Sequence, residues 1–105
     1  MLAIGNTPLI KLKRISEPGC AEIYVKYEGA NPTGSMKDRM ALSMIEGAEK
    51  RGQLQSGGMV MDYTGGSTGS SLAMVCATKG YRAHFISSER SEPERKSLRL
   101  FRIRG

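Results

Sequence analysis

The sequence has no tryptophan, a single histidine and only two cysteines among its 105 residues. Cys20 and Cys76 lie far apart, so they form neither a CxxC pair nor a metal-ligand spacing. His84 has no second ligand at the spacing that a metal site needs, and we expect it to have a structural role. These absences exclude a zinc-finger or thioredoxin-type motif. We expect no bound metal and two ordinary reduced thiols.

The chain also lacks a long apolar segment. No run approaches the roughly 18 residues that a membrane-spanning helix needs. The N-terminus has no basic segment followed by an apolar stretch, which a signal peptide would have. We therefore expect a cytoplasmic protein with no membrane partner.

What is present is a soluble globular composition, with 39% hydrophobic residues, 25% charged residues and a net charge of +6. Most of the charge excess comes from residues 90–105, whose basic members are Arg90, Arg95, Lys96, Arg99, Arg102 and Arg104. This tail either attracts phosphate or an acidic surface, or forms the solvated face of a helix, which we favour. A nucleic-acid partner is not favoured, because no aromatic platform or binding motif accompanies these residues.

Turn residues divide the chain into alternating strands and helices. Strands are predicted at 8–12, 22–28, 59–63 and 81–87, and helices at 35–51, at 68–79 and from residue 91 onward. Strands that alternate with helices pair in parallel through crossovers. The order therefore predicts an α/β fold with a parallel, Rossmann-like sheet in three layers. The strand at 22–28 has the alternation of a half-buried strand.

The helix that begins at Ser35 carries the first candidate for chemistry. Ser35 and Asp38 form a capping-box pattern, and the helix has an apolar face made of Met36, Met40, Ala41, Met44, Ile45 and Ala48. Lys37 lies in the first turn, where the helix dipole disfavours a cation. The neutral amine that this favours is the form that attacks a carbonyl to make a Schiff base. From this feature alone, an ordinary exposed lysine is the better interpretation.

The second candidate is the loop between the strand at 59–63 and the next helix, namely Thr64, Gly65, Gly66, Ser67, Thr68 and Gly69. Ligands of open α/β sheets bind beyond the carboxyl ends of the strands. A glycine-rich turn there lets backbone N–H groups and the helix N-terminus approach an anion. The spacing matches neither a Walker loop nor GxGxxG, and a tight turn with glycines for packing is an equal alternative.

Four motifs in order make the pattern specific: Ile4–Leu9, Lys26–Glu28 with Asn31-Pro32, Gly34–Arg39 and Thr64–Gly69. Together they resemble the cysteine synthase and cystathionine β-synthase family, the fold-type II pyridoxal-phosphate enzymes, over nearly the whole chain to about residue 98. The resemblance implies that Lys37 forms the Schiff base with pyridoxal 5'-phosphate and later moves the Cα proton of the substrate. It implies that the loop Thr64–Gly69 grips the carboxylate of an amino-acid substrate. The implied reaction is β-replacement on an activated serine, in which O-acetylserine and sulfide give cysteine.

Two departures from the family pattern matter. The usual loop reads Thr-Ser-Gly-Asn-Thr-Gly, and this chain has Gly65 for the serine and Ser67 for the asparagine that bonds the cofactor's ring hydroxyl. Family members are also longer, and their phosphate loop lies beyond residue 105. We therefore expect a single truncated N-terminal domain, with strands and a loop over 1–34 and an α/β portion over 35–105.

The expected activity depends on the missing phosphate loop. Without it, we expect weak or no turnover by these 105 residues. The alternatives are a serine or threonine dehydratase-type β-elimination, or a non-catalytic α/β fragment. Such a fragment would bind a partner chain, either a complementary domain or a second copy, through uncovered apolar surface.

Overall fold

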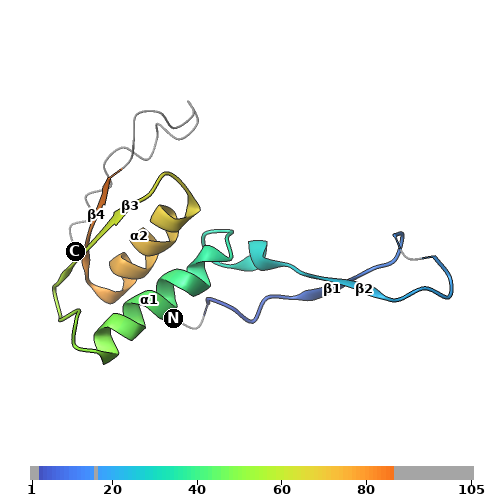
Figure 1. Cartoon of the computed structure of the whole chain (residues 1–105), viewed down its shortest axis with the longest axis horizontal. Helices are drawn as coiled ribbons and strands as arrows, with labels where there is room; N and C mark the ends of the chain where they lie inside the picture. The colour runs from blue at the N-terminus through green and yellow to red at the C-terminus, as the bar shows by residue number, and fades with distance from the viewer. Residues whose placement is uncertain (1–2, 16, 87–105) are drawn as a thin grey trace.

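The computed structural model describes residues 3–15 and 17–86, and Figure 1 shows their arrangement. The elements in chain order are β1 (Leu9–Leu12), β2 (Ile23–Lys26), η1 (Glu28–Ala30), α1 (Lys37–Lys50), β3 (Met59–Tyr63), α2 (Ser67–Lys79) and β4 (Arg82–Ile86). The predicted strands and the first two predicted helices are all found, and the α/β class is confirmed. The basic tail and the helix predicted after Ser91 lie outside the described residues.

Strands β1 and β2 form an antiparallel hairpin that projects away from the rest of the molecule (Figure 1). The register pairs Ile10 with Val25 and Leu12 with Ile23, so these four aliphatic residues share one face. All four residues of β2 are exposed, and Ile10 is 45% exposed. The expectation of a half-buried strand at 22–28 was wrong, because the hairpin packs on no other described element.

The body of the molecule is a β3–α2–β4 unit with α1 packed on its helical side (Figure 1). β3 and β4 pair in parallel, as predicted, from Met59 with Arg82 to Tyr63 with Ile86. The core lies between the two helices and the inner face of this sheet, and it consists of Ala41, Ile45, Leu72, Val75, Cys76, Tyr81 and Ala83. The order of layers is therefore sheet, α2 and α1.

Polar contacts at both ends show that α1 and α2 run in the same direction. Near their beginnings, Ser71 donates a hydrogen bond to Asp38, with 2.6 Å between the oxygens. Near their ends, Lys79 of α2 forms an ion pair with Glu49 of α1 at 2.8 Å, and the Tyr81 hydroxyl donates to the same carboxylate at 2.7 Å. These hydrogen bonds lower the pKa of Glu49, chiefly through Lys79. The N-termini of the two helices consequently lie at one end of the molecule.

Helix α1 begins two residues later than its sequence predicts. The Ser35 hydroxyl accepts a hydrogen bond from the Lys37 amide at 3.1 Å, whereas Asp38 turns back to Thr33, so the predicted capping box between Ser35 and Asp38 does not form. The predicted apolar face is also narrower than expected. Ala41 and Ile45 are buried, but Met36 and Met44 are 60% and 52% exposed.

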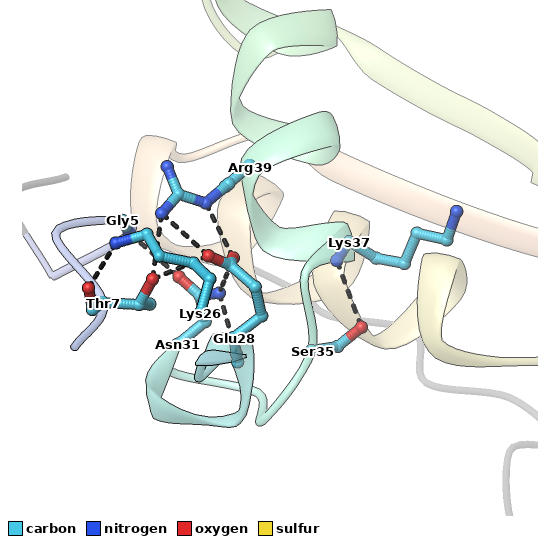
Figure 2. A network of polar contacts seen from close by, with 8 residues as sticks. All are labelled: Gly5, Thr7, Lys26, Glu28, Asn31, Ser35, Lys37 and Arg39. Atoms are coloured by element: carbon cyan, nitrogen blue, oxygen red, sulfur yellow. Dashed lines mark hydrogen bonds and ion pairs between the residues drawn. The ribbon is translucent and has the colours of Figure 1, made fainter. Parts of the chain in front are cut away.

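A cluster of polar side chains, the junction cluster, joins the base of the hairpin to α1 (Figure 2). The Glu28 carboxylate accepts hydrogen bonds from Arg39 Nε at 2.7 Å and Nη2 at 3.0 Å. It also accepts from the Thr7 hydroxyl at 2.6 Å and from the Asn31 amide at 2.9 Å. Asn31 in turn accepts from the backbone N–H of Gly5 at 2.9 Å. Three separated segments of the chain therefore meet on one carboxylate.

The donors around Glu28 hold its pKa at about 2, below the ordinary value of 4.5, with Arg39 as the largest cause. A carboxyl group whose pKa is lower in the folded than in the unfolded state stabilises the fold above its unfolded pKa. That contribution disappears as the pH falls through the folded value. Glu28 therefore contributes stability that is complete above pH 4.5 and is lost as the pH falls toward about 2.

Neither helix among residues 3–15 and 17–86 has the length and apolarity that crossing a bilayer requires.

The loss of stability in acid that Glu28 causes can be tested by substitution. Glu28→Gln removes the charged acceptor of the junction cluster, so we expect a lower free energy of unfolding at pH 7. That free energy should then decrease less between pH 4.5 and 2 than it does in the original chain. Urea unfolding at several pH values measures both. Glu17→Gln, which changes an exposed glutamate outside the cluster, is the matched control. An unchanged acid dependence in the Glu28 variant would contradict the assignment.

Candidate functional site

Lys37 is the first residue of α1, and its side chain points away from the junction cluster (Figure 2). It is partly buried, and its ammonium nitrogen has no hydrogen-bond or ion-pair partner among the described residues. Arg39 lies two positions later, but its charge is engaged by Glu28. The side-chain nitrogen of Lys37, at the N-terminus of α1, is therefore accessible to a ligand.

Asp38, the next residue, is fully buried at 0% exposure. It accepts hydrogen bonds from the Thr33 backbone N–H at 2.8 Å, from the Thr33 hydroxyl and from the Ser71 hydroxyl at 2.6 Å. Burial alone would raise the pKa of Asp38, but the hydrogen bonds from Ser71 and Thr33 outweigh it and the net shift is downward. Asp38 is therefore a charged carboxylate that ties the loop before α1 to α2.

The loop Thr64–Gly69 leaves the carboxyl end of β3 and enters α2. The Thr64 N–H still pairs with the Ile86 carbonyl at 2.9 Å, and the Thr64 hydroxyl accepts from the Gly69 N–H at 3.1 Å. A Cβ on Gly69 would lie 2.5 Å from the Thr64 methyl carbon, which is closer than real contacts allow. Glycine at this position is therefore required by the close approach of Thr64.

The first backbone N–H groups of α2 remain available for a ligand. Gly66 is the N-cap residue and provides no side-chain cap. Within the described part of the chain, no acceptor is found for the N–H groups of Gly65, Ser67 and Thr68. Unpaired donors at a helix N-terminus favour an anion through hydrogen bonding and through the dipole. The Ser67 side chain is exposed, so its hydroxyl is accessible as well.

The structure brings Lys37 and the loop Thr64–Gly69 to the same end of the helix pair. Each begins or directly precedes a helix, and the Asp38–Ser71 hydrogen bond joins the first turn of α1 to the second turn of α2. The Lys37 side chain and the unpaired N–H groups of the loop therefore lie on neighbouring elements.

Other candidates from the sequence are not part of this arrangement. His84 is exposed on β4, in register with Met61. Cys76 is buried in the core and Cys20 is exposed beyond the hairpin strands. No group of three or more metal-ligating side chains occurs in the portion that the structure describes.

Sequence reasoning missed the role of Asp38, Thr33 and Ser71. Thr33 and Asp38 are five positions apart, but Ser71 is 33 positions beyond Asp38. The capping-box pattern explained Asp38 locally and gave no reason to look for a distant partner. A clue was available, since Asp38 falls on the same face of α1 as Ala41 and Ile45, which are core residues.

Comparison with known proteins shows the family. The sequence profile of the family described as "Pyridoxal-phosphate dependent enzyme" matches residues 1–101. Cysteine synthase B of Salmonella typhimurium is 50% identical over 94 residues, which make up 90% of this chain and 31% of that protein. The chain thus spans about a third of the length of this curated relative.

Two solved structures agree with this result. The crystal structure of O-ureido-L-serine synthase superposes with a TM-score of 0.83 and 41% identity, covering 92% of this chain and 30% of that one. A hydrogen sulfide-producing enzyme from Fusobacterium nucleatum superposes with a TM-score of 0.81 and 46% identity, covering 92% and 32%. The chain therefore belongs to the family of pyridoxal-phosphate dependent enzymes, in its fold-type II branch.

Proposed function

We propose that this chain supplies the amine and the substrate loop of a cysteine synthase-like enzyme that acts on an activated serine. The observation that carries the proposal is the position of Lys37 and Thr64–Gly69 at one end of two parallel helices. The family's cofactor is pyridoxal 5'-phosphate. When bound, it supplies an electron sink for the pair of electrons left behind when a substrate loses its Cα proton.

The residues present fit this cofactor. Lys37 has a partly exposed side chain without an ion-pair partner in the described residues, so its amine is accessible to an aldehyde. The positive charge of Arg39 is balanced by Glu28, and Asp38 is enclosed by its own donors. No neighbouring carboxylate in the described chain therefore competes for the Lys37 amine. We assign Lys37 to hold the cofactor and to carry the proton that moves at the substrate Cα.

The loop Thr64–Gly69 has the donors that an amino-acid carboxylate requires. The N–H groups of Gly65, Ser67 and Thr68 lie at or just before the start of α2 and lack acceptors among the described residues. Gly69 keeps the turn tight against Thr64. We propose that these groups orient the substrate by its carboxylate, with Ser67 available to the cofactor ring. Because serine has a shorter side chain than the asparagine of the usual family loop, Ser67 reaches less far toward the ring.

Replacement and elimination begin with the same proton removal, and they diverge only after the β-substituent has been lost. The names of the relatives, cysteine synthase B and O-ureido-L-serine synthase, favour β-replacement. The dehydratase-type β-elimination stays an alternative, since the residues that would distinguish them are not in the described site. The predicted partner, a second copy or a complementary domain, also stays a prediction. The aliphatic face of the β1–β2 hairpin, exposed in this chain, supports it.

Labelling with pyridoxal phosphate and borohydride tests the lysine directly, because reduction fixes the cofactor to whichever amine has condensed with its aldehyde. We expect the mapped label to lie predominantly on Lys37, since its amine is accessible next to a site for anions. Lys37→Arg should remove this label. Lys50→Arg, at the exposed end of the same helix, should leave it in place. Equal labelling of all lysines would argue for the non-catalytic fragment.

The substrate loop can be tested without the cofactor. Titration with O-acetyl-L-serine should shift the amide resonances of Gly65, Ser67 and Thr68 in a saturable manner, whereas the corresponding carboxamide should not. Gly69→Ala should abolish the shifts because its Cβ collides with the Thr64 methyl group. Adding Thr64→Ser, which removes that methyl group and keeps the hydroxyl, should restore them. Shifts of the same size with the carboxamide would rule out carboxylate binding here.

The reaction itself can be assayed with two substrate sets. With pyridoxal phosphate present, O-acetylserine plus sulfide should give cysteine, at a rate well below that of a full-length relative. Serine alone should give no keto acid. Keto acid from serine alone would move the assignment to β-elimination, and a Lys37→Arg variant as active as the original chain would remove Lys37 from the mechanism.

A further inference from the structure

We propose that Asp38 and Arg39 are positioning residues. They fix the rotation of the first turn of α1 about its own axis and thereby the direction in which Lys37 points. The inference rests on the proposed function only in the use it assigns to Lys37. The rotational constraint itself comes from contacts of the described residues.

Helical geometry explains why two consecutive residues can aim a third. Successive residues on an α-helix are separated by about 100° around the axis. Lys37, Asp38 and Arg39 therefore leave the first turn in three different directions. Figure 2 shows this for the outer pair, with Arg39 directed into the junction cluster and Lys37 directed away from it.

The Asp38 contact fixes the side of the turn that faces α2. Its carboxylate is fully buried and holds Ser71 at 2.6 Å and the Thr33 N–H at 2.8 Å. A rotation of the turn would withdraw this charge from its donors. Since an unpaired buried carboxylate is strongly unfavourable, the turn resists such rotation.

The Arg39 contact fixes another side. Its guanidinium bonds Glu28 through two nitrogens, Nε at 2.7 Å and Nη2 at 3.0 Å, and Nη2 also donates to the Thr7 hydroxyl at 3.2 Å. A fork of this kind constrains direction as well as distance. Glu28 is itself held by Asn31, so the anchor does not swing with the arginine.

The two contacts are independent because their partners come from different parts of the fold. Ser71 belongs to α2, whereas Glu28 belongs to η1 at the base of the hairpin. With one contact alone, the first turn of α1 could still rotate about that contact. Two contacts on different sides of the turn prevent this rotation. They thereby set the direction of the neighbouring Lys37 side chain.

Variants of the distant partners test this without changing α1. Ser71→Ala removes a donor to Asp38, and Glu28→Gln removes the charge that binds Arg39. Tyr81→Phe is the matched control, because it removes a hydroxyl bond to a carboxylate, Glu49, near the other end of α1. Each variant is checked for its unfolding free energy, so that changes in the site can be compared at known stability.

The first measurement is amide hydrogen exchange on the cofactor-free chain. We expect Ser71→Ala and Glu28→Gln each to accelerate exchange of the Arg39 amide, which bonds the Met36 carbonyl, by roughly ten-fold, as loss of one hydrogen bond to a charged group can produce. Tyr81→Phe should accelerate the last turn and leave Arg39 unchanged. Equal acceleration of Arg39 by all three variants would reduce the effect to general stability and overturn the proposal.

The second measurement is the ratio of pyridoxal-phosphate label on Lys37 to label on Lys50 after borohydride reduction. The two site variants should lower this ratio, the double variant should lower it further, and the control should not. A ratio unchanged in both site variants would overturn the positioning role. If the original chain shows no preference for Lys37, the proposed function fails, and the exchange data still decide whether the turn is locked.

Discussion

The structure depends on one buried charge, the carboxylate of Asp38. An ionised group with no exposure to water is costly unless every strong acceptor site has a donor. Thr33 supplies a backbone N–H and a hydroxyl, and Ser71 supplies a second hydroxyl. These donors come from the loop before α1 and from α2, so satisfying the charge brings three segments into one arrangement. The packing of Ala41 and Ile45 against Leu72 and Val75 then continues along the same helix interface.

The parallel orientation of α1 and α2 has an electrostatic consequence. Both helices present their positive dipole ends to one region. In α1 the first amides have acceptors in Ser35 and Met36, whereas in α2 the amides of Ser67 and Thr68 have none among the described residues. The two termini are therefore suited to different tasks: α1 presents the Lys37 side chain, and α2 presents donors to an anion. The proposed function depends on this division.

The base of the hairpin contributes more to the stability of the fold than its strands do. Its strands expose Ile10, Ile23 and Val25 on one face, and a two-stranded ribbon of this kind gains little stability by itself. Its base carries Glu28 into contact with Arg39, and this junction cluster connects the hairpin to α1. The low pKa of Glu28 reflects how strongly the donors favour its charged form. The junction cluster thus links the conformation of the hairpin base to that of α1, which carries Lys37.

The sequence alone determined the elements, the α/β class, the family and the two candidate site segments, because these depend on local signals. Turn residues separated the strands from the helices, and the order of four motifs predicted the family. Only the tertiary structure decided that the hairpin stands apart, that Met36 and Met44 face solvent, and that Asp38 bonds Ser71 rather than Ser35. These outcomes depend on contacts between residues far apart in the chain. A local pattern predicts hydrogen bonds only between residues close in sequence. In the folded chain, a buried charge such as that of Asp38 is stabilised by whichever donors surround it, including distant ones.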